Sequence, residues 1–223
     1  MNIFILSGGN HPYEESTPVL KEFLTNAGHS ITTTEDASKI EQSTYMNQFD
    51  VLMFNTLRVE ELTFTKNQQE CLKNLISSGK GFICIHISGC IPDNWQEYRK
   101  ITGGGWEMAK SFHPPFSKFN VETNKNHPIV NNVPDFKTND ELYMNIEYEK
   151  DNEVFLTAHA DEGTYEWRGN SVLMSGGEYP LGWTRKYGNG KVMVTLLGHN
   201  GLSFKTEEFQ KIILNGINWS NNS

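Results

Sequence analysis

A chain of 223 residues is long enough for one α/β domain with a single core, and no linker or repeat divides it, so we expect one domain over residues 1–223. Its 27 acidic and 19 basic residues give a formal net charge of −8, and no Lys/Arg cluster offers a surface for a phosphate backbone, which excludes nucleic acid as an expected partner. No apolar run approaches the roughly 20 residues that a membrane-spanning helix needs, so we expect no membrane partner either.

The cysteines and the first residues bear on where the protein works. Cysteines stand only at positions 71, 84 and 90, an odd number without a close Cys-x-x-Cys pair, which favours reduced thiols over disulfides or a zinc knuckle. The opening MNIFILSGGN has no basic segment, and its apolar run is too short for a secretion signal. The sequence therefore predicts a cytoplasmic protein.

The first 90 residues alternate between strand and helix signals, which is typical of βα units that build a parallel sheet. Short apolar runs beside turn residues predict buried strands at 2–6, 50–55 and 81–85. Thr17 followed by Pro18 predicts the N-terminus of the helix after the first strand.

Two further helices have recognisable start signals. Thr65 and Gln68 form a capping box ahead of apolar residues at helical spacing. The last helix is expected to begin near Thr206, because acidic residues in its first turn suit the positive end of a helix dipole.

The second half of the chain has a more mixed pattern. Residues 116–123 alternate between apolar and polar, which indicates an antiparallel strand with one wet face, whereas 154–160 predicts a more buried strand. Asn189-Gly190 lies between two strand-like runs and is the strongest hairpin signal in the chain. We therefore expect a doubly wound α/β domain with antiparallel strands beside its parallel sheet.

Histidines follow three of the predicted strands. His11 lies in GGNHP, His86 in GFICIHISGC and His199 in LGHN, each just after an apolar run. In an open parallel sheet, ligands bind beyond the carboxyl ends of the strands. A single histidine there would more simply bond a loop carbonyl, but three at corresponding ends predict a common pocket.

Four segments resemble the trehalose-utilisation (ThuA-like) family: GFICIHIS, HPPF, NHPIVNNVPDFKTNDELY and YPLGWTRKYGNGKVMVTLLGHN. The resemblance covers nearly the whole chain. It implies a class I glutamine-amidotransferase-like fold, that is, a single-domain flavodoxin-like three-layer sandwich with a mostly parallel central sheet and an antiparallel extension. It also implies a role in the use of trehalose or related disaccharides through keto-sugar intermediates.

The related amidotransferases use a cysteine on a sharp strand-to-helix elbow, with a His-x-Glu on a late strand. Cys84 lies inside a predicted strand, so we expect it to point into the core, and Cys90 lies nearer the loop. His199 is followed by Asn200 and Gly201, which leaves a glycine where the triad would need a carboxylate. We therefore expect that the protein is not a glutamine amidotransferase and that no cysteine is catalytic.

The candidate catalytic residues are His86, His199, Glu141 and Arg185. One of the two histidines would take a proton from a carbon or a hydroxyl, because an imidazole with a pKa of about 6.5 works in both directions at neutral pH. Glu141 would be the second acid/base, and Arg185 would stabilise an oxyanion. Arg185 also fits a plainer interpretation, a surface ion pair worth about 0–1 kcal/mol.

Eight residues are candidates for a sugar pocket. Aromatic rings offer flat apolar faces to a pyranose, and amides or hydroxyls bond its hydroxyl groups, although aromatic residues are also ordinary core material. The triplet at 103–105, all glycine, lacks the spacing of a phosphate loop and is expected to be a flexible lid. The candidates are Asn10, His11, Trp106, His113, Tyr143, Trp183, Thr184 and Asn200.

We expect no cofactor. A divalent metal such as zinc is the alternative, held by a His/His/Glu set drawn from His86, His113, His199 and Glu141. The sequence favours the metal-free interpretation because no two ligands stand at helical or knuckle spacing.

The sequence leaves two functions open. The leading one is an enzyme, an isomerase, lyase or hydrolase that acts on a small-molecule sugar or keto-sugar by His/Glu acid-base chemistry. The alternative is a non-catalytic carbohydrate-binding or interaction protein that kept the fold. A homo-oligomer is compatible with either.

Overall fold

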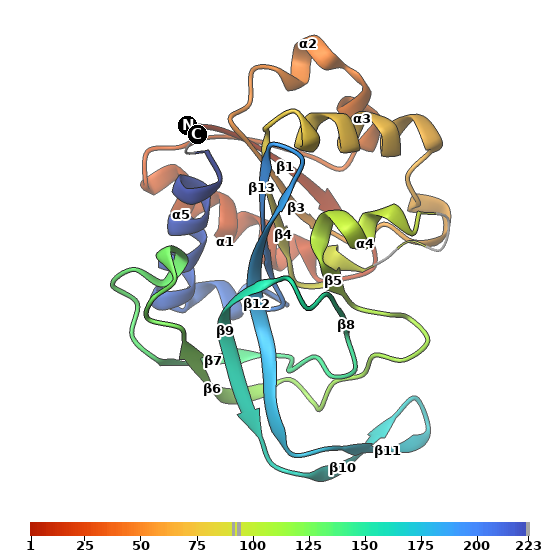
Figure 1. The fold of residues 1–223 in the computed structure, drawn as a ribbon, viewed down its shortest axis with the longest axis vertical. Coiled ribbons are helices and arrows are strands. Elements are labelled where there is room, and N and C mark those ends of the chain that lie inside the picture. The colour runs from red at the N-terminus through yellow and green to blue at the C-terminus, as the bar shows by residue number, and fades with distance from the viewer. Residues whose placement is uncertain (91, 93–94, 222–223) are drawn as a thin grey trace.

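The computed structural model describes residues 1–90, 92 and 95–221 (Figure 1). Within them, a nine-stranded mixed sheet runs through the molecule in the order β2-β1-β3-β4-β13-β12-β9-β6-β7. These strands are β1 (Asn2–Gly8), β2 (Ser30–Thr34), β3 (Val51–Thr56), β4 (Gly81–Ile85), β6 (Ser117–Thr123), β7 (Phe136–Asp140), β9 (Glu153–Ala160), β12 (Gly177–Tyr187) and β13 (Gly190–Thr195).

The sheet has a parallel half and an antiparallel half. Strands β2, β1, β3, β4 and β13 pair in parallel, in the order that flavodoxin-like folds share. From β13 onwards each neighbour is antiparallel, through β12, β9, β6 and β7. The predicted parallel sheet with an antiparallel extension is therefore confirmed.

Helices cover both faces of the parallel half and complete the predicted three layers. On one face, Leu20 of α1 (Tyr13–Asn26) and Ile213 of α5 (Glu207–Asn221) pack with Ile3 and Ile5 of β1. The opposite face carries α3 (Lys66–Ser77), α4 (Glu97–Thr102) and the short α2 (Ser43–Met46). Successive residues of β1 therefore serve two different cores, as expected for a strand buried on both sides.

Two helix starts illustrate what local signals can and cannot tell. The capping box of Thr65 and Gln68 is present at the start of α3, as predicted. The first helix, however, begins at Tyr13, so the predicted start at Thr17 is wrong and Pro18 lies inside α1. Thr17 instead bonds the Ser7 hydroxyl at 2.7 Å, a tertiary contact that the local sequence does not reveal.

The β12–β13 hairpin is present, but its turn is shifted by one residue. Tyr187 pairs with Gly190, so the two turn residues are Gly188 and Asn189 rather than Asn189 and Gly190. Gly188 has φ +59°, the left-handed conformation that such a tight turn needs. Glycine adopts it without steric cost, which explains the position of the turn.

The glycine triplet is not the flexible lid that the sequence suggested. Residues 103–105 are all buried, and β5 (Gly104–Gly105) pairs with β8 (Glu147–Tyr148). A Cβ on Gly105 would lie 2.2 Å from the carbonyl oxygen of Gly89. Glycines are needed here because two backbone segments pass in direct contact.

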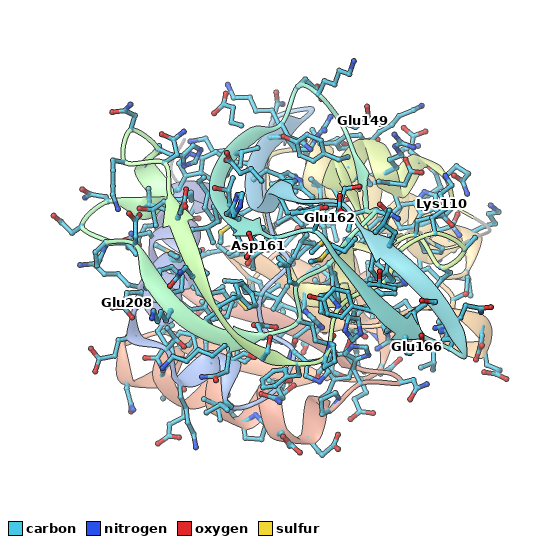
Figure 2. All side chains as sticks on the ribbon, turned by 90° about the horizontal axis from the view of Figure 1, so that it is seen from below. Lys110, Glu149, Asp161, Glu162, Glu166 and Glu208 are labelled. Atoms are coloured by element: carbon cyan, nitrogen blue, oxygen red, sulfur yellow. The ribbon has the colours of Figure 1, made fainter. Side chains whose placement is uncertain are left out.

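A second small ribbon was not anticipated. It comprises β10 (Gly163–Trp167) and β11 (Asn170–Met174) and extends from the lower end of the sheet in Figure 1. Figure 2 looks at the molecule from this end, where the exposed Asp161, Glu162 and Glu166 are labelled. Among the described residues, no helix has both the length and the apolar character that crossing a bilayer requires.

Candidate active site

Three histidines and a glutamate meet beyond the carboxyl ends of the strands. His11 follows β1, His86 follows β4, His199 follows β13, and Glu141 follows β7. The centroid of the His86 ring lies 5.3 Å from that of His11 and 5.2 Å from that of His199. The centroids of the His11 and His199 rings are 5.3 Å apart. We call His11, His86, Glu141 and His199 the His/Glu cluster.

His86 occupies the sharp turn between β4 and a 3₁₀ turn at His86–Gly89. Its φ is +54°, a conformation that costs a non-glycine residue energy and that recurs at functional sites. A strand followed by a strained residue and a helical turn is the geometry of a nucleophile elbow. Here the elbow residue is an imidazole rather than a thiol.

Cys84 points into the core, as predicted. It is fully buried, and its Sγ lies 3.3 Å from the hydroxyl of Tyr98. Burial raises the pKa of the Cys84 thiol to about 12, so it carries almost no thiolate at neutral pH.

The two ring nitrogens of His86 have different surroundings. Nδ1 lies 2.8 Å from the carbonyl oxygen of Leu196. Because a carbonyl only accepts, Nδ1 carries the proton of the neutral ring, and Nε2 presents its lone pair. This Nε2 receives a hydrogen bond from the Tyr143 hydroxyl at 2.5 Å and lies 3.3 Å from Nδ1 of His199.

Glu141 links the imidazoles. Its Oε2 lies 3.2 Å from His199 Nδ1 and 3.4 Å from His86 Nε2, and its Oε1 lies 3.4 Å from His113 Nε2. Burial alone would raise the pKa of the Glu141 carboxyl, but the hydrogen bond from His199 and the positive charge that the neighbouring imidazoles carry when protonated outweigh it and lower that pKa. Burial would likewise lower the pKa of His199, and the bond to Glu141 raises it instead. The two residues therefore form an ion pair.

His11 presents an unused nitrogen to the cluster. Its Nδ1 lies 2.6 Å from the carbonyl oxygen of Asn10, whereas its Nε2 is buried without a hydrogen-bond partner among the described residues. Burial, together with the repulsion that a protonated His86 would add, lowers the pKa of His11 to about 4, so the His11 ring is neutral at pH 7. The hydroxyl of the neighbouring Tyr13 is also buried and has no hydrogen-bond partner in the part of the chain that the structure describes.

Asp140 holds the two loops of the site together, a role that the sequence did not reveal. The side chain is fully buried. Its Oδ2 accepts the backbone N–H of Gly198 at 2.7 Å, and its Oδ1 accepts those of Glu141 at 2.9 Å and His199 at 3.3 Å. Asp140 therefore fixes the backbone on both sides of the Glu141–His199 ion pair.

The predicted aromatic faces form a wall behind the cluster rather than an open platform. Tyr143 and Trp106 are only 1% and 4% exposed, and their rings pack edge to face at 4.5 Å. Trp167, at the end of β10, joins this wall with its ring 4.6 Å from that of His113. His113 itself bonds the carbonyl of Pro114 through Nδ1 at 2.8 Å and turns Nε2 towards the cluster.

Three predicted residues are not brought to the cluster. Trp183, Thr184 and Arg185 lie on β12, which is antiparallel to β13, and Arg185 pairs with Val192 near the start of β13. These three residues therefore lie towards the edge of the sheet that is opposite to the one where His199 lies. Arg185 donates to Asn152 and pairs with Asp151, as its plainer interpretation suggested, while the Trp183 ring is buried and donates to a backbone carbonyl.

Thr184 is a structural partner of His127, and this pair gives a pH prediction. His127 Nε2 lies 2.9 Å from the Thr184 hydroxyl, and its Nδ1 accepts the N–H of Ile129. Burial lowers the pKa of His127. Below about pH 6.5 this histidine therefore binds a proton more readily in the unfolded chain than in the folded protein, and acid destabilises the fold. We expect acid to lower the urea midpoint less in His127→Asn than in the wild type between pH 7 and pH 5. An equal fall in the urea midpoint of both proteins between pH 7 and pH 5 would contradict this.

The two predicted asparagines have backbone roles in the structure. Asn10 is exposed and offers its carbonyl to His11. The Oδ1 of Asn200 accepts the N–H groups of Leu202 and Ser203, so it caps the turn after His199. Both residues lie next to cluster histidines in the chain. Among the described residues, neither asparagine side chain bonds a ring nitrogen of those histidines.

A cavity of about 480 Å³ adjoins the cluster on the side of His11. The hydroxyl-bearing Thr17, Thr33 and Thr34 and the carboxylate of Glu35 line it, along with Tyr13. Its volume is within the range of small-molecule sites, and its polar lining suits a polyhydroxylated ligand. His11 is the residue that borders both this cavity and the His/Glu cluster.

Solved structures with this fold come from several bacteria. A protein described as ThuA-like from Parabacteroides merdae is 19% identical, with a TM-score of 0.77 over 99% of this chain and 89% of that one. Another from Bacteroides uniformis is also 19% identical, with a TM-score of 0.75 over 98% and 89%. A cytoplasmic protein of Salmonella typhimurium LT2 is 14% identical, with a TM-score of 0.63 over 99% of both chains. At these identities the likeness shows a shared fold.

The sequence comparisons agree with the fold and with the resemblance of the four motif segments. No curated protein matches the chain. The family described as trehalose utilisation (ThuA) matches it over residues 2–220, which include every residue of the His/Glu cluster. The chain therefore belongs to the ThuA, or trehalose-utilisation, family.

Proposed function

We propose that the protein is an enzyme of disaccharide utilisation that moves protons on a sugar or keto-sugar at the His/Glu cluster. The observation that carries this proposal is the connected set of Tyr143, His86, His199 and Glu141, buried at the strand exits with His86 on a strained elbow. Strained backbone combined with shifted pKa values is characteristic of catalytic sites. Membership of the trehalose-utilisation family supports the substrate class.

In this proposal the cluster contains both an acid and a base. The lone pair of His86 Nε2 is suited to take a proton from the carbon next to a ketone or from a sugar hydroxyl. His199, whose pKa is raised by its hydrogen bond to Glu141, is suited to return it. The hydroxyl of Tyr143 lies where it can donate to an oxygen that gains negative charge, the role that the sequence had given to Arg185.

The substrate class can be tested first by ligand binding. Trehalose, related disaccharides and their 3-keto derivatives are added at increasing concentration in a thermal-shift assay. A ligand at about 100 times its dissociation constant adds about 2.7 kcal/mol, which corresponds to roughly 5–10 °C for a domain of this size. No shift with any sugar would count against the substrate class.

The catalytic role is tested with His86→Ala and a matched control. We expect His86→Ala to lower turnover of the best keto-sugar by at least about 100-fold, the usual contribution of a general acid or base, with the sugar still bound. The control is His159→Ala, because His159 is an exposed residue of β9 that lies 3.8 Å from Asp161 and is not part of the cluster. Loss of affinity alone, with no turnover by the wild type, would favour the non-catalytic carbohydrate-binding protein.

Location and assembly follow the same proposal. A small-molecule carbohydrate is the expected partner, and the Salmonella neighbour described as cytoplasmic supports a cytoplasmic location. Sedimentation of the purified chain would give its oligomeric state.

A further inference from the structure

We infer that the His/Glu cluster is a binding site for one divalent transition-metal ion, such as Zn²⁺ or Mn²⁺, with an open position for an oxygen of the sugar. The inference rests on the proposed function for its substrate class, but the ion site itself stands on geometry. His11, His86, Glu141 and His199 each offer one ligand atom, and these four atoms lie within 4.8 Å of one another.

The distances within the cluster fit a shared ion. Ligands at about 2.1 Å from a tetrahedral metal are about 3.4 Å from one another. The His86–His199, His86–Glu141 and His199–Glu141 atom pairs are 3.3, 3.4 and 3.2 Å apart. Three of the four ligand atoms therefore already stand at the spacing of a metal's coordination shell.

The protonation of His86 and His11 favours ligation as well, whereas His199 would release the Nδ1 proton that it shares with Glu141 when an ion binds. Metal-binding histidines characteristically donate their other N–H to a carbonyl or carboxylate, which fixes the tautomer. Nδ1 of His86 bonds the Leu196 carbonyl, and Nδ1 of His11 bonds the Asn10 carbonyl. In both rings Nε2 is therefore the nitrogen whose lone pair is left for an ion.

His11 provides the independent observation that points to a ligand. Its Nε2 is buried without a hydrogen-bond partner among the residues described, although the three groups around it are polar. A buried acceptor left unsatisfied costs about 1–3 kcal/mol. A metal ion at the centre of the cluster would satisfy this nitrogen, whereas acid-base chemistry at His86 and His199 gives it no role.

The donor set selects the class of ion. Three imidazoles and one carboxylate suit zinc, manganese, iron, cobalt or nickel, whereas calcium and magnesium prefer oxygen ligands throughout. Such an ion would polarise a carbonyl or hydroxyl oxygen of a bound sugar. With the four cluster residues as ligands, His86 and His199 would no longer be the acid and base, and Tyr143 and His113, which contact them from outside, would move the protons instead.

The experiment uses the full chain without a histidine tag. Elemental analysis is followed by removal of metal with a chelator and by titration with Zn²⁺, Mn²⁺ and Co²⁺, the last giving visible absorption bands that depend on its ligands. We expect about one ion per chain, and a loss of affinity of at least about 100-fold in His11→Ala and in Glu141→Gln. The control His159→Ala removes an exposed imidazole outside the cluster, and this variant should bind the ion like the wild type.

Each result separates the ion site from the proposed function. Unchanged affinity and Co²⁺ spectrum in both His11→Ala and Glu141→Gln, checked for folding by circular dichroism, would overturn the site. Turnover that survives complete metal removal would overturn a catalytic ion and leave the acid-base proposal standing. A bound ion lost in these two variants, without turnover on any sugar, would support the site and overturn the proposed function.

Discussion

Asp140→Asn is expected to lower the free energy of unfolding by about 2–4 kcal/mol, although the two side chains have nearly the same shape. The Asp140 carboxylate accepts three backbone N–H groups, from Glu141, Gly198 and His199, in a fully buried position. Hydrogen bonds to a charged acceptor contribute about 1.5–3 kcal/mol, and a buried donor left without a partner costs about 1–3 kcal/mol.

The amide of asparagine cannot replace both oxygens. In either orientation its NH₂ group faces at least one of the three N–H groups, so a donor meets a donor inside the protein. Because these N–H groups belong to the loops that carry Glu141 and His199, we also expect metal affinity to fall by about 10–100-fold, as when outer-shell partners are removed.

Asp135→Asn is the matched control. Asp135 also accepts a backbone N–H, that of Thr123, and pairs with Lys125, but its side chain is 60% exposed. Water can replace these contacts, so we expect a change of about 0–1 kcal/mol. Urea unfolding at pH 7 gives both values, and an equally small change for Asp140→Asn would show that its buried bonds are not needed.

The sequence contained enough to place three of the four cluster residues. Parallel strands have their carboxyl ends on one edge, so histidines after three of these strands are expected at the same edge of the sheet. His11, His86 and His199 follow this rule. It depends only on strand order and direction, which apolar runs and capping signals indicate well.

The misplacement of Arg185 could have been avoided with the same reasoning. The Asn189-Gly190 signal predicted a hairpin, so the strand before the turn had to run back against the strand after it. Residues close to that turn lie at the amino end of β13, whereas His199 follows its carboxyl end. Arg185 and His199 therefore belong to opposite edges of the sheet.

Other features of the site have no local signal. The four cluster residues come from four separate loops, so no spacing in the sequence could indicate a common ion. The positive φ of His86 is imposed by tertiary packing, since nothing in its own side chain requires it. The burial of Asp140 depends on the loop after β13, about 60 residues further along the chain.

Gly105→Ala is expected to be among the most damaging single substitutions in the chain. Gly105 has φ +151°, and a Cβ there would lie 2.2 Å from the carbonyl oxygen and 2.5 Å from the carbonyl carbon of Gly89. Both contacts are with backbone, which cannot rotate away. Gly89 ends the 3₁₀ turn that begins at His86, so relief of this clash would shift the elbow of the active site.

The expected cost of Gly105→Ala is about 3–5 kcal/mol, from overpacking and from a backbone conformation that suits only glycine. This corresponds to a melting temperature lower by roughly 6–20 °C for a domain of this size. Gly169→Ala is the control, because Gly169 also has a positive φ, +77°, but no atom lies within 4 Å of its added Cβ. It should cost only about 1 kcal/mol of backbone strain.

Gly89→Ala completes the series and keeps it informative if Gly105→Ala does not fold. A Cβ on Gly89 would meet the carbonyl oxygen of Gly104 at 3.2 Å, a tight contact that a small shift can relieve. We therefore expect thermal stability to decrease in the order Gly169→Ala, Gly89→Ala, Gly105→Ala. Equal losses for Gly169→Ala and Gly105→Ala would mean that the strained conformation, and not the contact between the two backbone segments, decides the stability of the elbow.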